Sequence, residues 1–309
     1  MNQSSRTAEH MAFFRALESQ RPHGGRLFND PYAASFLSPG FRRALRVACV
    51  PVLGRAIPWL ADVIVPGARS SGIARTRWID DALLAALAGG IRQVVILGAG
   101  FDCRAFRIPE MRAARIFEVD HPSTFATKRE RLGRWSEREP ENLKFVQIDF
   151  NRESLEDVLR QAGFDPAVRS VFIWEGVTNY LTAEAVNCVM CFVASCAVGT
   201  ELIFTYVHRS ALDHSGTFPD ADKLLRSLEE IGEPWTFGLL PEEAPEFLRN
   251  AGLQLRRDVG SGDYRGQYMG GRGRHMKGYD FYRVAVGDVP PRNDWSVAAV
   301  NAQVEDAVR

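Results

Sequence analysis

Five short apolar segments that alternate with helical stretches constrain the fold of this chain more than any other feature. The helical stretches lie near residues 123–134, 152–162 and 182–196. The apolar segments are rich in Val, Ile and Phe and occupy residues 93–97, 115–119, 144–148, 170–174 and 201–206. Continuous apolar strands between helices are typical of a parallel sheet that is covered on both faces. We therefore predict an α/β protein with a mostly parallel sheet.

The region before the first predicted strand is expected to be helical throughout. In residues 7–20, apolar side chains recur at spacings of three and four, as on one face of a helix. A second helix is expected after Asn29 or Asp30 as its N-cap, with Pro31 as the first helical residue. A third is expected near residues 75–87, before a pair of glycines that would end it.

The region after Tyr206 begins with a polar, irregular segment. Helices are predicted near residues 220–231 and 241–251. Two apolar segments, at residues 253–260 and 279–287, close the chain. We expect these two to form edge strands of the sheet, paired with each other in antiparallel fashion.

Composition and charge exclude several classes of protein. The 309 residues include 38 Lys and Arg and 38 Asp and Glu, so no basic excess remains to neutralise nucleic-acid phosphates. The N-terminus has no apolar signal core, and arginines and prolines interrupt the apolar stretch 44–68 too often for it to span a bilayer. Cys188 and Cys191 have no second pair with which to bind zinc, and their apolar neighbours predict a buried helix. We expect a cytoplasmic protein with a small-molecule substrate, no metal, and neither nucleic acid nor a membrane as partner.

A glycine turn directly after the first predicted strand indicates a nucleotide-type ligand. Gly98-Ala99-Gly100 follows this strand, and Asp120 ends the next strand twenty residues beyond Gly100. In open α/β sheets, ligands bind beyond the carboxyl ends of the strands, where glycines allow close approach and an acid binds ribose hydroxyls. This combination alone predicts only a ligand that carries adenosine.

The residues that follow the turn distinguish between two such ligands. A dinucleotide places its pyrophosphate on the N-terminus of a full helix. Here Pro109 interrupts the helix after barely two turns, and Cys103 stands where a third glycine is expected. S-adenosylmethionine carries adenosine, a sulfonium and an amino acid but no phosphate, so it fits this sequence better than NAD. An NAD-dependent oxidoreductase remains the alternative enzyme, and a non-catalytic cofactor-binding protein is a third reading.

Two further acids end predicted strands. Asp149 follows the third strand and Glu175 follows the fourth. Because the carboxyl ends of parallel strands share one edge of the sheet, these acids and Asp120 are expected to face one crevice. They could bind an adenine amino group and a cationic ligand there. Taken alone, Asp149 could equally be a solvated acid or a helix cap.

The sequence resembles the leucine carboxyl methyltransferases, in particular their bacterial branch of S-adenosylmethionine-dependent methyltransferases. The segments that carry the resemblance run in order along the chain and are "SRTAEHMAFFRA", "LFNDPYAASFL", "ARTRWIDDAL", "QVVILGAGFDCRAFRI", "FEVDHP", "WEGVTNYLT" and "GEPWTFGLLPEEAPEFLRNAGL". The resemblance implies a Rossmann-like class I methyltransferase sheet at residues 89–309 with a helical cap at 1–88. It also implies a lid near 207–238, after the fifth strand.

The resemblance further implies which residues bind the cofactor. Arg75 would hold the carboxylate of the methionine end, with Arg77 as a second candidate, and Asp120 would bind the ribose. Glu175 would lie near the cofactor amino group. The full set of cofactor contacts implied by the matching motifs is Arg75, Gly98, Ala99, Gly100, Asp120, Asp149, Phe150, Glu175 and Tyr180.

The methyl acceptor is less determined by the sequence. The eukaryotic relatives carry a lysine in their N-terminal helix, whereas this chain offers Arg6 and Thr7. This departure disfavours protein C-termini as the acceptor, although a protein carboxyl methyltransferase stays as an alternative. Bacterial relatives serve natural-product pathways, including polyketide O-methylation. The apolar segment 47–66 either buries its own core or lines a large acceptor pocket.

Methyl transfer from a sulfonium is an in-line displacement, so the protein mainly aligns the reactants in a dry pocket. A carboxylate acceptor needs no base, whereas a phenol would gain from one. The candidate bases are His208 and, with weaker support, Tyr206, His121 and His214. For each histidine a structural or solvent-exposed ring is the competing reading. We predict O-methylation, on a carboxyl or a phenolic hydroxyl, of a small and largely apolar metabolite.

Overall fold

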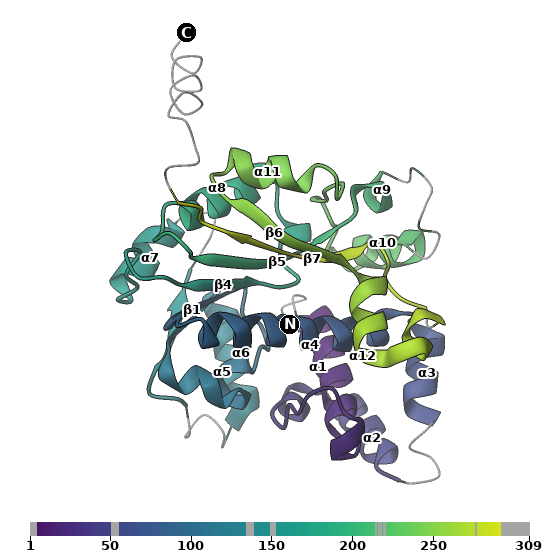
Figure 1. The fold of residues 1–309 in the computed structure, drawn as a ribbon. Helices are drawn as coiled ribbons and strands as arrows, with labels where there is room; N and C mark the ends of the chain where they lie inside the picture. Colours follow the sequence, from purple (N-terminus) through teal and green to yellow (C-terminus); the bar gives the residue numbers. More distant parts are fainter. Residues whose placement is uncertain are drawn as a thin grey trace.

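The computed structural model describes residues 5–50, 56–133, 139–148, 153–213, 215, 218, 221–275 and 277–291. Its centre is a seven-stranded sheet with the order β3-β2-β1-β4-β5-β7-β6 (Figure 1). The strands are β1 (Gln93–Leu97), β2 (Arg115–Asp120), β3 (Leu143–Gln147), β4 (Val171–Trp174), β5 (Glu201–Val207), β6 (Gln254–Gly260) and β7 (Tyr282–Asp288). The first five strands pair in parallel, which confirms the predicted fold class.

The last two strands differ from the prediction in their placement. They pair with each other antiparallel, as expected, but β7 also pairs antiparallel with β5 along its whole length. Of these two strands only β6 therefore lies at an edge of the sheet, and β3 forms the other edge. The burial of the two strands agrees with this order, because β7 is almost entirely buried whereas β6 has several exposed side chains.

Alternate residues of the strands point to the two faces of the sheet and form two separate cores. Val94 and Ile96 of β1 pack with α4 (Ala68–Ala88) and α12 (Ser261–His275). Val95 and Leu97 pack with α7 (Leu155–Gln161), α8 (Ala183–Ala194) and α11 (Ala244–Asn250). In Figure 1, α8 and α11 lie above the sheet, and α4, α5, α6 and α12 lie below it. The helices after β1 are α5 (Arg104–Arg107), α6 (Pro122–Leu132), α7 (Leu155–Gln161), α8 (Ala183–Ala194), α9 (Arg209–Leu212), α10 (Ala221–Glu230), α11 (Ala244–Asn250) and α12 (Ser261–His275).

The N-terminal region is helical, as predicted. Its helices are α1 (Ser5–Ser19), α2 (Pro39–Ala48), α3 (Ala56–Ile64) and α4 (Ala68–Ala88), with short 3-10 turns η1 (His23–Gly25) and η2 (Ala33–Phe36). The helix expected after Asp30 is only the turn η2. Its N-cap residue is Tyr32 rather than Asn29 or Asp30, and Pro31 lies before it. The Asp30 carboxylate stabilises the start of the turn, since it accepts hydrogen bonds from the backbone N–H groups of Tyr32 and Ala33.

Helix α4 is longer than predicted and belongs to two parts of the molecule. Its first turns carry buried polar residues, so they lack an apolar pattern; the Ser71 hydroxyl, for example, lies 2.8 Å from that of Ser261 in α12. Its later residues, such as Ile79 and Leu83, pack on the sheet. Residues 1–88 therefore include side chains that pack directly on the sheet. The domain division at residue 88 stays a prediction.

Two local predictions need correction. Helix α12 was not expected, because its sequence contains five glycines, and Gly270 within it has a non-helical φ of 61°. It forms by packing on α4, where Tyr264 is fully buried. Cys188 and Cys191 are exposed, since the buried stripe of α8 consists of other residues, namely Val186, Val189, Met190 and Val193. None of the helices in the described ranges has the length and hydropathy of a transmembrane span.

Candidate functional site

The glycine turn lies at the carboxyl end of β1, where the strand order reverses direction between β2 and β4. Gly98 and Gly100 have φ values of 63° and 47°, a region that side chains other than glycine rarely adopt. A Cβ on Gly98 would also collide with the side chain of Val177. The helix that follows is a single turn, and a 3-10 turn, η3 (Pro109–Ala113), succeeds it. This confirms that the chain builds no full helix that could seat a pyrophosphate here.

Asp120 stands at the end of β2, directly beside this turn. One carboxylate oxygen accepts a hydrogen bond from the backbone N–H of Gly100 at 2.6 Å. The other accepts one from the N–H of His121 at 2.7 Å. An ionised carboxylate has about four acceptor positions, so these two bonds orient it and leave capacity for two ribose hydroxyls. The side chain is only partly buried, so a ligand can reach it.

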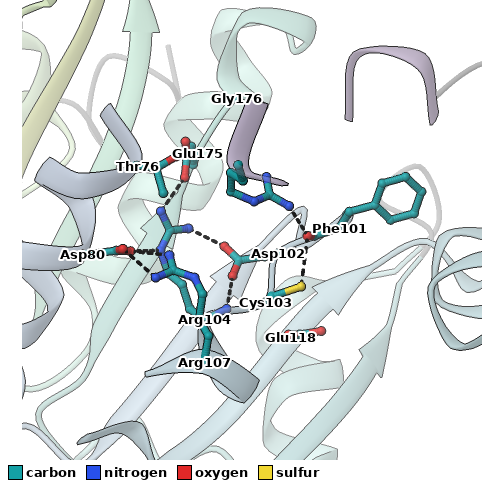
Figure 2. A network of polar contacts seen from close by, with 12 residues as sticks. Thr76, Asp80, Phe101, Asp102, Cys103, Arg104, Arg107, Glu118, Glu175 and Gly176 are labelled. Carbon is teal, nitrogen blue, oxygen red and sulfur yellow. Dashed lines mark hydrogen bonds and ion pairs between the residues drawn. The ribbon is translucent and has the colours of Figure 1, made fainter. Parts of the chain in front are cut away.

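A network of buried charges lies next to the turn and centres on Arg104 (Figure 2). Its Nε donates to Asp80 Oδ1 at 2.9 Å, and its Nη2 donates to Glu175 Oε2 at 2.8 Å. The remaining terminal nitrogen pairs with the carboxylate of Asp102. Arg107, one helical turn further on, binds both oxygens of Asp80 at 2.7 Å. The network thus joins α4, the glycine turn and the end of β4.

Glu175 is held between two guanidinium groups. Besides Arg104, Arg75 of α4 donates its Nε to Glu175 Oε1 at 2.9 Å. Burial alone would raise the pKa of Glu175, but the charges and hydrogen bonds of Arg104 and Arg75 outweigh it and lower the pKa to about 2. Glu175 is therefore ionised at neutral pH.

Arg75 is placed to hold a carboxylate. Within the described part of the chain its hydrogen bonds run through Nε alone, so its two terminal nitrogens are available to a ligand. Its guanidinium carbon lies 4.6 Å from the ring centroid of Tyr282. Planar guanidinium groups suit carboxylates, and the aromatic face keeps this one in position. Arg77 points elsewhere, because it pairs with Asp81 and donates to the carbonyl of Leu27.

A buried ion pair supports β2 from behind. Lys128 of α6 and Glu118 of β2 are fully buried, and their charged atoms lie 2.6 Å apart. Burial raises the pKa of Glu118 to about 7 in spite of the lysine. Glu118 precedes Asp120 by two residues on the same strand, so the pair fixes the strand that carries the ribose-binding candidate.

The predicted acceptor-side bases are in less suitable positions. Tyr206 is fully buried within the sheet, and its hydroxyl donates to Asp258 and accepts from Arg283. Burial, and then Asp258, raise its pKa, so it does not suit the role of base. His208 is the N-cap of α9, and its Nδ1 accepts the backbone N–H of Ser210 at 3.2 Å.

His121 is also a helix N-cap. It precedes α6, and its Nδ1 accepts a hydrogen bond from the backbone N–H of Ser123. Asp149, Phe150 and His214 lie outside the described residues. The structure thus brings together Arg75, the glycine turn, Asp120 and Glu175.

Several aromatic rings continue from Arg75 towards the predicted lid, and we call this set the aromatic cluster. Trp235 lies with its ring centroid 5.9 Å from Tyr282 and 6.1 Å from Phe281. Tyr180 faces Trp235 edge-on at 6.3 Å. The cluster consists of Tyr180, His208, Phe218, Trp235, Tyr279, Phe281 and Tyr282. The cluster adjoins Glu175 through Tyr282, whose ring contacts the Arg75 guanidinium that binds Glu175.

Sequence reasoning missed the centre of the charged network. The sequence analysis assigned no role to Asp80, Asp102, Arg104 and Arg107, and charged side chains are mostly exposed. Two arginines spaced by three, directly after a glycine turn, were the available signal. Their partner in α4, Asp80, can be identified only from the folded structure.

The strand order, the glycine turn without a pyrophosphate seat and its acidic partners fit the class of S-adenosyl-L-methionine-dependent methyltransferases. The family match and the named relatives show that the protein belongs to this class. Within that class, the chain belongs to the leucine carboxyl methyltransferase family, whose sequence model matches residues 8–194. This family membership confirms the resemblance stated above, and S-adenosyl-L-methionine is the cofactor.

Named relatives agree with this membership. A protein of Streptomyces coelicolor whose name includes "S-adenosyl-L-methionine-dependent methyltransferase" is 33% identical over 264 residues, which is 82% of this chain and 88% of that protein. A relative of the same description from Parafrankia is 38% identical over 188 residues, and the match covers 58% of this chain but only 55% of the relative.

A solved structure shows the same fold. A crystal structure described as a methyltransferase from Thermobifida fusca aligns with 89% of this chain and 97% of its own, with a TM-score of 0.56 and 20% identity. A second one, from Streptomyces avermitilis, has a TM-score of 0.52 and 16% identity. These likenesses concern the fold alone.

Proposed function

We propose that the protein transfers the methyl group of S-adenosyl-L-methionine to an oxygen of a small, largely apolar metabolite of the natural-product type. The observation that carries this proposal is the aromatic cluster beside Arg75. The ring of Tyr282 contacts both Arg75 and Trp235. A ligand whose methionine end is held at Arg75 would therefore present its methyl group beside aromatic walls. Such walls suit an apolar acceptor and exclude water.

The residues of the chain would act mainly by alignment. The bound cofactor supplies a methyl group that is already activated by the sulfonium charge. Arg75 would hold the cofactor carboxylate through its terminal nitrogens, and Asp120 would hold the ribose hydroxyls. Glu175, which stays ionised between its two arginines, would face the amino group. Holding reacting atoms about 3–3.5 Å apart in line is a large part of catalysis for such a displacement.

Of the two acceptor types, the geometry supports a carboxylate better than a phenol. A carboxylate is ionised at neutral pH and needs no base, whereas a phenol with a pKa of about 10 does. The neutral form of His208 has one nitrogen that can take a proton, and this nitrogen, Nδ1, already accepts the N–H of Ser210. The same holds for His121 and Ser123. We therefore propose a carboxyl group as the preferred acceptor.

A matched acceptor panel tests this proposal. The enzyme is incubated with methyl-labelled S-adenosyl-L-methionine and with aromatic carboxylic acids, the corresponding phenols, and a peptide with a free C-terminus. We expect label in esters of the small acids, which mild base hydrolyses, and His208→Ala should retain that transfer. If instead a phenol is the better acceptor and His208→Ala lowers its rate by about a hundredfold or more, the carboxyl assignment is wrong and His208 is the base. Label in the peptide would identify a protein carboxyl methyltransferase.

A further inference from the structure

Helices α2 and α3 form a hairpin whose inner faces anchor it to the rest of the molecule. On α2, the inner stripe repeats at spacings of three and four and consists of Phe41, Ala44, Leu45 and Ala48. On α3, Ile57 and Ala61 contact the same apolar cluster, which also includes residues of α1. Two helices with their apolar stripes turned inward would ordinarily have polar outer faces.

The outer face of α3 is apolar instead. Trp59 and Ile64 have exposed fractions of 64% and 60%, and Val63 and Leu60 have 54% and 44%. These four side chains lie on one side of the helix, at relative positions 0, 1, 4 and 5. Val47 and Val50, at the end of α2, are exposed as well. Of the seven large hydrophobic residues exposed in the described part of the chain, six belong to the hairpin. Such concentration marks an interaction surface.

The same hairpin is positively charged. Arg42, Arg43 and Arg46 are exposed on α2. Between residues 31 and 79 the sequence has one acidic residue, Asp62, although the whole chain carries equal numbers of acidic and basic residues. The Asp62 carboxylate is bound by Arg69, with Nε 2.9 Å from Oδ1, so it does not offset the arginines of α2.

We propose that the α2–α3 hairpin docks on an anionic lipid bilayer. Exposed aromatic and aliphatic side chains next to arginines are the combination that binds the interface of such a bilayer. The hairpin forms a corner of the molecule, beyond α1 and α4 (Figure 1), and a bilayer accepts a convex corner without matching its shape. A second copy of the chain fits less well, because a twofold contact would bring the arginines of both copies together. The sequence-based expectation of no membrane partner rested on the lack of a spanning segment, which docking does not require.

Vesicle sedimentation with the full-length protein tests this proposal. The vesicles are phosphatidylcholine alone or phosphatidylcholine mixed with phosphatidylglycerol. We expect sedimentation with the mixed vesicles, weakened by salt, and little with phosphatidylcholine alone. The variants Trp59→Ser/Val63→Ser and Arg43→Gln/Arg46→Gln should each lower the partition coefficient by about tenfold or more. Val198→Ser is the matched control, since Val198 is 45% exposed but lies outside the hairpin, and it should sediment like the parent.

Unchanged melting temperature and cofactor affinity of the hairpin variants would show that only the surface was altered. The proposal is overturned if the parent does not sediment with the mixed vesicles, or if the hairpin variants sediment as the parent does. It is equally overturned if the parent is a dimer in solution that Trp59→Ser/Val63→Ser converts to a monomer, because the surface is then covered by a second copy.

Discussion

At the scale of single residues, the candidate cofactor site contains carboxylates that are oriented before any ligand arrives. Asp120 is the clearest case, because two backbone N–H groups hold its two oxygens. A side chain fixed in this way loses little conformational entropy when it binds a ribose.

Replacement of Asp120 by Ala should therefore remove most of the affinity for S-adenosyl-L-methionine. The loss of two charge-assisted hydrogen bonds predicts a fall of about a hundredfold or more, measured by titration calorimetry. Asp157→Ala, at an exposed position on α7, is the control and should bind normally. Near-parental affinity in the Asp120 variant would contradict the assignment of the ribose site.

At the scale of elements, Arg104 joins three parts of the structure that are distant in sequence. It binds Asp80 on α4, Asp102 in the glycine turn and Glu175 at the end of β4. Its side chain is almost fully buried, so the three carboxylates depend on it for compensation of their charge. Buried ion pairs add little net stability when formed, but the removal of one partner is costly.

Arg104→Gln should accordingly lower the free energy of unfolding by about 3–5 kcal/mol at neutral pH. The exposed Arg160 of α7, which pairs with Glu156, offers the control; Arg160→Gln should cost less than about 1 kcal/mol. The effect of Arg104→Gln should depend on pH. The pKa of Glu175 is lowered from 4.5 to about 2, so its stabilising charge is present above pH 4.5 and is lost as the pH falls towards 2. Urea unfolding between pH 4.5 and pH 2 measures the difference in the free energy of unfolding between the parent and Arg104→Gln. If this difference stays constant down to pH 2, the charge of Glu175 does not contribute to it.

At the scale of the whole molecule, the sheet and the helix α4 bring the candidate cofactor residues together at the carboxyl ends of the strands. Arg75 comes from α4, Glu175 from the end of β4, and Asp120 from the end of β2. A ligand that bridges these elements binds the folded state alone and therefore stabilises the entire fold.

S-adenosyl-L-methionine should raise the melting temperature, whereas NAD should not. At a concentration of about 100 times the dissociation constant, the gain in free energy is about 2.7 kcal/mol. For a chain of this length that corresponds to a rise of at least several degrees in a calorimetric scan. S-adenosylhomocysteine serves as a positive control, because it keeps the adenosine and amino acid groups. A shift with NAD and none with either sulfur compound would restore the oxidoreductase alternative.

The sequence by itself determined the architecture of the sheet and the position of the glycine turn. Continuous apolar segments separated by helical ones leave few other ways to bury both faces of a strand, and five strands appeared within one or two residues of their predicted bounds. Gly98, Gly100 and Asp120 could be located because a left-handed turn and a strand-end carboxylate have local sequence signals. The short helix before Pro109 was predictable because a proline interrupts a helix.

Only the tertiary structure decided which charges meet and which surfaces stay exposed. The pairing of Arg104 with Asp80 and Glu175 spans 24 and 71 residues of sequence, and no local pattern encodes it. Helix α12 forms against α4 in spite of its glycines, since packing outweighs intrinsic helix propensity. The outer face of α3 was ambiguous for a related reason. The apolar sequence indicates only that these side chains are unfavourable in water. Whether the protein itself or another surface covers them depends on the fold.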